Sequence, residues 1–155
     1  MLLPGVPSTG MIEELEFEMS ELPARPATIL VADDDPSVCQ AISKTLRRNG
    51  YTVISADGGE SAMSLVVARQ GAIDLAIIDM QMPGLNGLDL AVEVARAYPA
   101  MRILYISGNH QSIALDCISR HSPESVLFKP FGFEALLEKV AGLLGNELEQ
   151  TNGAT

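Results

Sequence analysis

Polar side chains capable of chemistry follow four short apolar stretches of the sequence. They comprise three carboxylates, a hydroxyl and an ammonium group: Asp33 and Asp34, Asp79, Ser107, and Lys129. Such apolar stretches are typical of buried parallel strands, and the carboxyl ends of parallel strands meet at one edge of a sheet, beside a crevice. We therefore expect these side chains to converge, which packing alone would not explain.

The three carboxylates predict a metal ion. Asp33, Asp34 and Asp79 repel one another and cannot all stay ionised at close range without a counter-charge. A hard divalent cation supplies that charge, and Mg²⁺ suits a site with few protein ligands and several waters. Asp35 is interpreted as the cap of the helix that follows rather than as another ligand.

The same set of side chains could receive a phosphoryl group. A metal beside a carboxylate can clamp the oxygens of an incoming phosphoryl group, and Asp79 could then act as the nucleophile and carry it. Lys129 would hold one phosphoryl oxygen as a point charge, and the Ser107 hydroxyl would donate to another. Gly108 would leave room for that approach.

Strands and helices in alternation must position these groups. The predicted strands cover residues 29–32, 52–56, 75–79, 102–107 and 125–128. The predicted helices begin with the Asp35-Pro36 cap and then cover about 60–70, 88–98, 113–120 and 133–144. This alternation predicts an α/β fold with a doubly wound, five-stranded parallel sheet.

For two of the helices the periodicity also predicts the inward face. In the helix over 88–98 the inward residues are expected to be Leu88, Ala91, Val92 and Ala95. In the last helix they are expected to be Phe133, Leu136, Leu137, Val140, Leu143 and Leu144.

Size and charge exclude several classes of protein. The 155 residues argue for one domain, and the formal net charge of −10 argues against direct nucleic-acid binding, because phosphate backbones would repel the chain. No apolar run reaches the roughly 20 residues of a membrane span, and the N-terminus lacks a secretory signal. With only Cys39 and Cys117 there is no disulfide framework, so we expect a cytoplasmic protein without a membrane partner.

The chain divides into three predicted parts. Residues 1–26 form an acidic extension punctuated by prolines, which is either a flexible tail or a short helix that docks on the domain or on a partner. Residues 27–146 form the globular domain. Residues 147–155 are a polar tail.

Four ordered motifs resemble those of the receiver domain of two-component response regulators, of the chemotaxis-regulator type. They are residues 29–36, residues 74–84 with Asn86-Gly87, residues 103–108, and residues 128–131. The resemblance implies a flavodoxin-like (βα)5 fold, Mg²⁺ as cofactor, and phosphotransfer to Asp79 from a histidine kinase or a histidine phosphotransfer protein. It also implies a switch that acts on a downstream protein rather than a turnover enzyme.

The resemblance assigns a role to each site residue. Asp33 and Asp34 would be the acidic metal pair, and the backbone carbonyl of Gln81 would complete the metal site beside Asp79. Ser107 would be the switch hydroxyl and Lys129 the lysine that senses the phosphate. Val126 departs from the pattern, because receivers of this type usually carry an aromatic residue there, so switching by an aromatic rotamer is in doubt.

Several alternatives stay open at this point. Asp33 and Asp35 fit the Asp-x-Asp spacing of haloacid-dehalogenase-like phosphohydrolases, in which Asp33 would be the nucleophile, although Pro36-Ser37 stands where such enzymes place Gly-Thr. An unphosphorylated docking module is a third reading. A receiver could stand alone or be part of a hybrid kinase or larger regulator, and it could form a phosphorylation-linked dimer.

Overall fold

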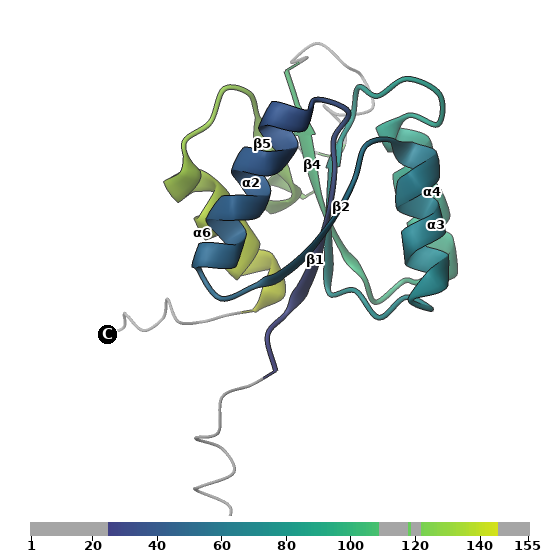
Figure 1. Ribbon diagram of the computed structural model, residues 1–155, viewed down its shortest axis with the longest axis horizontal. Coiled ribbons are helices and arrows are strands. Elements are labelled where there is room, and N and C mark those ends of the chain that lie inside the picture. The colour runs from purple at the N-terminus through teal and green to yellow at the C-terminus, as the bar shows by residue number, and fades with distance from the viewer. Residues whose placement is uncertain (1–24, 109–117, 119–121, 146–155) are drawn as a thin grey trace, which may run out of the picture.

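A central sheet with helices on both faces makes up the described part of the chain, as the computed structural model shows (Figure 1). The structure describes residues 25–108, 118 and 122–145. The strands in this part are β1 (Thr28–Ala32), β2 (Thr52–Ala56), β3 (Leu75–Asp79), β4 (Arg102–Ser107) and β5 (Val126–Phe128). The helices are α2 (Pro36–Arg48), α3 (Gly59–Ala68), α4 (Gly87–Ala97), the 3-10 turn η1 (Pro123–Ser125) and α6 (Phe133–Leu144).

The sheet has the order β2-β1-β3-β4-β5, and every pair of neighbouring strands is parallel. The predicted doubly wound, five-stranded sheet is therefore confirmed. Because β1 and β3 are neighbours at the centre of the sheet, the residues at their carboxyl ends lie next to each other.

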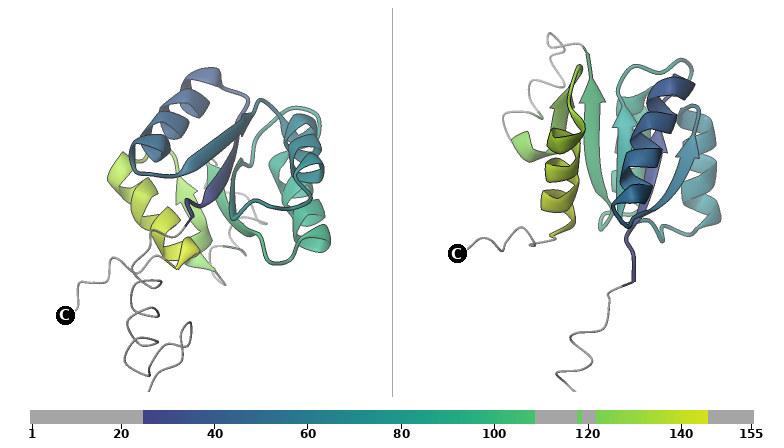
Figure 2. Two further views of the ribbon diagram at one scale, coloured as in Figure 1. Left: turned by 60° about the horizontal axis from the view of Figure 1, so that its bottom comes forward. Right: turned by 60° about the vertical axis from the view of Figure 1, so that its left-hand side comes forward.

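Each face of the sheet packs on its own pair of helices. Helices α2 and α6 cover one face and α3 and α4 the other, as two views agree (Figures 1 and 2). Alternate residues of β1 divide between the two cores, since Ile29 and Val31 pack with α2 and α6, and Leu30 and Ala32 with α3 and α4. A strand buried on both faces explains the continuous apolar run.

The element bounds follow the prediction closely, with one strand shortened. Three predicted strands, over 52–56, 75–79 and 102–107, have the bounds found in the structure. β5 begins at Val126 rather than at Ser125, because Pro123 starts a 3-10 turn that takes in Ser125. The helix predicted over 113–120 lies outside the described residues except for Ile118, as do the extension before Arg25 and the tail after Gly145.

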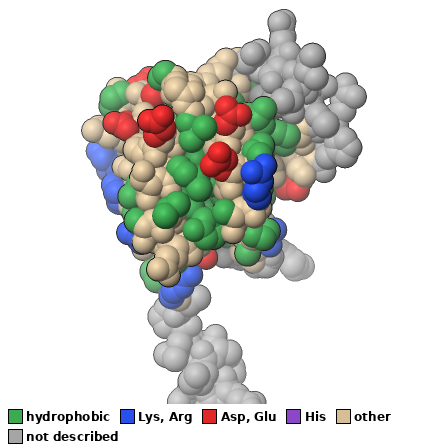
Figure 3. Space-filling view, turned by 90° about the vertical axis from the view of Figure 1, so that its right-hand side faces the viewer, with side chains coloured by type: hydrophobic (Ala, Val, Ile, Leu, Met, Phe, Trp, Pro, Cys, Tyr) green, Lys and Arg blue, Asp and Glu red, His purple; other side chains and the backbone are tan. Residues whose placement is uncertain are grey.

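The predicted inward face of α4 is confirmed for Ala91 and wrong for Val92 and Ala95, while Leu88 is half-buried. The buried residues are Gly87, Leu90, Ala91 and Val94, whereas Val92 is 48% exposed and Ala95 is also exposed. A Cβ at Gly87 would collide with the carbonyl oxygen of Asp79, so this glycine must face β3 and thereby sets the rotation of the helix. Figure 3 views the resulting outer face, where hydrophobic side chains remain on the surface.

Phe133 was also predicted to point inward, and it is 47% exposed. It occupies the first turn of α6, where it lines a surface hollow with Ala41 and Lys44 of α2 instead of reaching the sheet. The remaining predicted residues of α6 lie in the core or pack against it, and Leu136 and Val140 are fully buried.

No helix among the described residues is long and apolar enough to cross a membrane.

Candidate functional site

Asp33 and Asp79 are buried carboxylates at the carboxyl ends of the two central strands. They are 2% and 4% exposed, respectively, and Asp34 beside them is exposed. Backbone hydrogen bonds continue past the strand ends, since the Asp33 amide donates to the carbonyl of Ala56 and the Met80 amide to that of Ile106. The sheet thus fixes the backbone that carries the carboxylates.

Both carboxylate oxygens of Asp79 have a partner. The backbone amide of Gln81 donates to Oδ1 at 3.0 Å, and the ammonium of Lys129 donates to Oδ2 at 3.3 Å. This pair of contacts sets the orientation of a side chain that is almost fully enclosed. A buried, oriented carboxylate with an exposed acidic neighbour is suited to react with a group that enters from solvent.

Asp33 lies in an environment that resists its charge. Burial raises the pKa of the Asp33 carboxyl above its usual range, and the charges of Asp79 and Asp34 raise it further. The amide of Asp35, which donates to Oδ1 at 2.9 Å, and the Lys129 ammonium 3.8 Å from Oδ2 act in the opposite direction on that pKa. One ammonium therefore contacts both buried carboxylates, Asp33 and Asp79.

The arrangement of these oxygens fits a divalent cation. One carboxylate oxygen each from Asp33, Asp34 and Asp79 lies within 4.8 Å of the other two. Oxygen ligands, excess negative charge and an open side at the exposed Asp34 are what Mg²⁺ requires, because it keeps several waters when bound. The backbone carbonyl of Gln81 remains a predicted ligand, since only the amide of that residue has a defined contact here.

Ser107 and Lys129 reach the same edge from β4 and the loop after β5. Ser107 is 1% exposed, and its carbonyl accepts a hydrogen bond from the Lys129 amide at 2.9 Å. Asp79 pairs in register with Ile106, so Ser107 is the next residue along β4. Among the described residues, a Cβ at Gly108 would meet only the Lys129 side chain, at 3.9 Å, so the space beside this glycine is open.

Asp35 is a helix cap, as predicted. Its Oδ1 accepts a hydrogen bond from the Ser37 amide at 3.0 Å at the start of α2, where Pro36 is the first helical residue. The carboxylate is exposed and is not one of the three that converge. This use of Asp35 weighs against the phosphohydrolase alternative, which needs the second acid of its pair at the reaction centre.

Gly87 is a functional residue that our sequence reasoning missed. The sequence analysis gave it no role of its own, but the close approach of α4 to the backbone of Asp79 and Met80 requires a residue without a side chain. Asn86 caps the helix, because its side-chain oxygen accepts from the Asp89 amide at 2.9 Å. The Asn86-Gly87 pair, which follows Asp79 in the sequence, is the feature from which this close packing could have been predicted.

Val126 and Tyr105 are neighbours in the sheet, in register across β4 and β5. Val126 is buried, and burial raises the pKa of the half-buried Tyr105 phenol. The sequence departure at Val126 is thus a small core residue next to an aromatic one on the adjacent strand.

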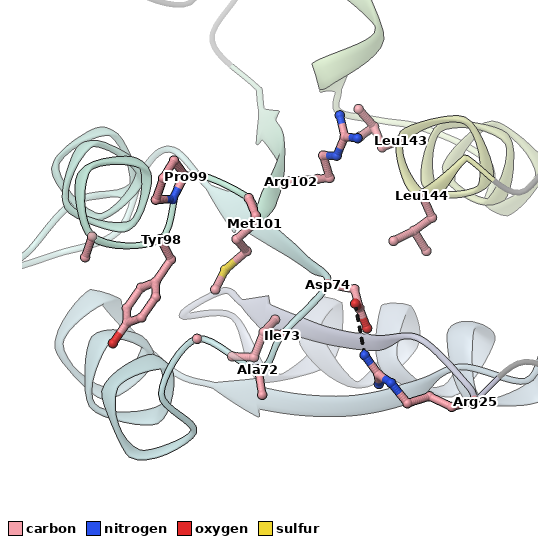
Figure 4. Close-up of a pocket in the computed structure, with 13 residues that line it drawn as sticks. Arg25, Ala72, Ile73, Asp74, Tyr98, Pro99, Met101, Arg102, Leu143 and Leu144 are labelled. Atoms are coloured by element: carbon pink, nitrogen blue, oxygen red, sulfur yellow. Dashed lines mark hydrogen bonds and ion pairs between the residues drawn. The ribbon is translucent and has the colours of Figure 1, made fainter.

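A hollow of about 530 Å³ lies at the opposite edge of the sheet and contains none of the predicted site residues (Figure 4). Arg25 crosses it to form an ion pair with Asp74 at 3.3 Å, and Asp74 also accepts from the Thr28 amide. These contacts anchor the start of β1. Of the three convergent carboxylates, Asp33 lines a smaller hollow of about 390 Å³, together with Asp57.

The chain belongs to the response regulator receiver domain family, whose sequence profile matches residues 29–141. Among curated proteins it is 28% identical over 131 residues to the transcriptional regulatory protein GlrR of Escherichia coli, with 84% of this chain and 28% of that protein covered. It spans from 12% to 53% of the lengths of the relatives compared, which include the sensor kinase CckA of Brucella abortus.

Solved structures agree with that assignment. The response regulator TrrA of Thermotoga maritima, solved with Mg²⁺ and BeF, is 31% identical and has a TM-score of 0.66 over 76% of this chain and 98% of that one. A receiver domain protein from Clostridium thermocellum is 26% identical, with a TM-score of 0.68 over 79% of this chain and 98% of that one. The expected fold and family are confirmed, and the chain is a signalling domain.

Proposed function

We propose that this domain accepts a phosphoryl group on Asp79 from the phosphohistidine of a histidine kinase or phosphotransfer protein, with Mg²⁺ as cofactor. The observation that carries the proposal is the environment of Asp79. It is enclosed, held at both oxygens, and grouped with two further carboxylates around space for a cation. The similarity to TrrA, which was solved with Mg²⁺ and BeF, supports the same chemistry here.

The residues take distinct parts in the transfer. An oxygen of the Asp79 carboxylate attacks phosphorus, the bond from phosphorus to the histidine nitrogen breaks, and the nitrogen keeps the electron pair. Lys129 then moves from Asp79 to a phosphoryl oxygen, and the Ser107 hydroxyl donates to another. Mg²⁺ held by Asp33, Asp34, Asp79 and the Gln81 carbonyl would offset the negative charge of the phosphoryl oxygens.

The switch then acts through protein contacts. We propose a cytoplasmic domain over residues 27–146 with acidic and polar flanks, which signals to a downstream protein without binding nucleic acid itself. The relatives include transcriptional regulators and a sensor kinase, of which this chain covers only a part. Both a receiver that stands alone and one that belongs to a hybrid kinase or larger regulator are compatible with that coverage.

Labelling by a small phosphodonor tests the acceptor. With acetyl phosphate and Mg²⁺, the chain should incorporate at most one phosphoryl group, and removal of Mg²⁺ by a chelator should reduce labelling at least about 100-fold. Asp79→Asn should fold normally and remain unlabelled, whereas Asp35→Asn, which changes an exposed cap, should be labelled like the original chain.

The same assay separates the alternatives. Sustained hydrolysis of a phosphomonoester, abolished by Asp33→Asn and not by Asp79→Asn, would establish the phosphohydrolase instead. An intact, Mg²⁺-binding chain that is never labelled by acetyl phosphate or by a phosphorylated kinase would leave only the docking module.

A further inference from the structure

The hollow of about 530 Å³ at the amino ends of the strands is lined mostly by apolar residues (Figure 4). Among them, Ile73 and Met101 are buried, and Tyr98 and Leu144 are half-buried. They come from the segments before β3 and β4 and from the end of α6. An open apolar surface that three elements build together is suited to receive the apolar side chains of a further segment.

The charged part of this lining is positive on balance. Arg25 is paired with Asp74 at 3.3 Å, whereas Arg102 forms no ion pair with another residue in the described part of the chain. The Arg102 side chain is exposed and reaches the hollow from the first position of β4. One uncompensated positive charge beside apolar groups favours an occupant that combines apolar side chains with carboxylates.

The acidic extension of this chain combines the two properties. Arg25 lines the hollow, so the chain that precedes it starts at the hollow. In a helix over residues 12–22, four apolar residues would lie within an arc of about 80°; they are Ile12, Leu15, Met19 and Leu22. The glutamates of this segment would all lie outside that arc; they are Glu13, Glu14, Glu16, Glu18 and Glu21.

We propose that residues 12–22 dock as a helix in this hollow, with their apolar stripe on Ile73, Met101 and Leu144 and with glutamates beside Arg102. A helix suits the site because the hollow lies at the ends of the strands. An extended segment would find no strand edge there to pair its backbone groups, whereas a helix pairs its own.

The connection to the domain is short enough to hold the segment at the hollow. Only Pro23 and Ala24 separate Leu22 from Arg25, so the Cα atoms of Leu22 and Arg25 lie at most about 11 Å apart. Pro23 also favours an end of the helix at the residue before it. A tether of this length gives an effective concentration of roughly millimolar, so a weak contact is enough for docking.

Helix α2 is another positively charged surface that an acidic segment could bind. It contains no acidic residue, and Lys44, Arg47 and Arg48 are exposed on it. The hollow beside them, of about 520 Å³, is lined by polar and basic residues and Cys39. That surface could pair with glutamates, but it offers no seat for a stripe of four apolar side chains. The hollow at Arg25 therefore fits the segment better.

Amide hydrogen exchange of the full chain, without phosphodonor, tests the docking. The amides of residues 16–22, which have partners within the helix, should exchange at least about 10-fold more slowly than in an unstructured chain. An undocked helix of this length is marginal in water, so the protection reports docking. Leu144→Ser should bring these amides to within about threefold of the unstructured rate, because it removes an apolar contact from the hollow.

Leu137→Ser is the matched control. Leu137 lies on the same helix, is also half-buried and packs against the same core as Leu144, but it does not line the hollow. It should leave the protection of residues 16–22 unchanged, and thermal unfolding verifies that both variants fold. Absence of protection in the original chain, or protection that Leu144→Ser does not lower more than Leu137→Ser, would overturn the proposal.

Charge reversal distinguishes the two positive surfaces. Arg102→Glu should lower the protection at least about threefold, because it places a negative charge beside the glutamates. Arg48→Glu makes the same change at an exposed arginine of α2 and should have no effect. A larger effect of Arg48→Glu would place the segment on α2 and contradict the proposal.

The dependence on concentration shows which chain supplies the segment. Protection should be the same from about 10 μM to 500 μM, because the tether joins the segment to its own domain. Protection that rises with concentration would mean that a second copy supplies it, against the proposal. The hollow and Asp79 lie at opposite ends of the strands and no phosphodonor is used, so a failure of docking and a failure of phosphorylation are recognised separately.

Discussion

One ammonium group serves two buried carboxylates in this domain. Lys129 lies 3.3 Å from Asp79 and 3.8 Å from Asp33, at distances that permit it to leave either partner without a large movement. A lysine rather than an arginine suits this position, because an ammonium has no preferred planar partner and can change its contact as a point charge.

Removal of that ammonium should separate metal binding from the response to phosphorylation. In Lys129→Ala the three carboxylates repel one another more strongly, so Mg²⁺ should bind as tightly as before or up to about 10-fold more tightly. The change in amide hydrogen exchange that beryllofluoride, a phosphoryl mimic, induces in the original chain should be lost.

Lys44→Ala, which removes an exposed lysine from α2, is the control and should alter neither measurement. An unchanged exchange response in Lys129→Ala would contradict the role given to this residue, and so would a loss of Mg²⁺ binding.

At the scale of the elements, the β3–α4 connection is a rigid junction. Gly87 begins α4 against the backbone of Asp79 and Met80, and Gly59 begins α3 against the backbone of Leu85, so neither glycine has room for a side chain. The connection is thereby enclosed between two helix starts, and its shape is determined by backbone packing.

Gly87→Ala should therefore destabilise the domain. We expect a loss of about 2 to 3 kcal/mol in the free energy of unfolding, measured with denaturant, because the new methyl group can be accommodated only if α4 moves away from β3. Labelling of Asp79 should slow as its backbone shifts.

Gly142→Ala is the matched control. This residue lies inside α6 with open space where a Cβ would be, so alanine should be neutral or stabilising by up to about 1 kcal/mol. Equal stability of the Gly87 and Gly142 variants would show that the junction is not rigid.

The elements also show what sequence can and cannot predict. The strand ends were predictable, because a strand buried on both faces is a continuous apolar run and the polar residue that ends it is plain. The rotation of α4 was not, since its sequence has apolar residues on two sides and only the contact of Gly87 with Asp79 selects one. The convergence of Asp33 and Asp79 followed from strand order, whereas the hydrogen bonds that orient Asp79 depend on loop geometry that no pattern reports.

For the molecule as a whole, the acidic edge opposes folding. The carboxyl of Asp33 binds a proton more tightly in the folded chain than in the unfolded one, because its pKa is raised by burial and by Asp79. Where the folded state holds more protons, stability falls as the pH rises from the unfolded pKa through the folded one. The contribution of Asp33 should thus make the metal-free domain less stable at neutral pH than under mildly acidic conditions.

Asp33→Asn should remove the destabilisation that the ionised Asp33 carboxylate causes at neutral pH. At neutral pH without metal, the variant should be more stable than the original chain by about 1 kcal/mol in denaturant unfolding, and its stability should depend less on pH above the ordinary carboxyl range. Mg²⁺ should stabilise the original chain at neutral pH and have little effect on the variant.

Asp57→Asn, an exposed acid after β2, should behave like the original chain in both conditions. A variant at Asp33 that is less stable than the original at neutral pH would show that the carboxylate is compensated in some other way.

The first residue of α4, Gly87, packs directly on the backbone of Asp79, so the helix should pivot at that contact as a rigid body. A helix rises about 1.5 Å per residue, so Val92 stands about 7.5 Å beyond that pivot. If the backbone of Asp79 shifts, α4 tilts and its exposed face around Val92 is reoriented. A contact that displaces this exposed face displaces the backbone of Asp79 in turn. By thermodynamic reciprocity, a partner bound to the outer surface of α4 and a phosphoryl group on Asp79 would then bias each other's binding to the same degree.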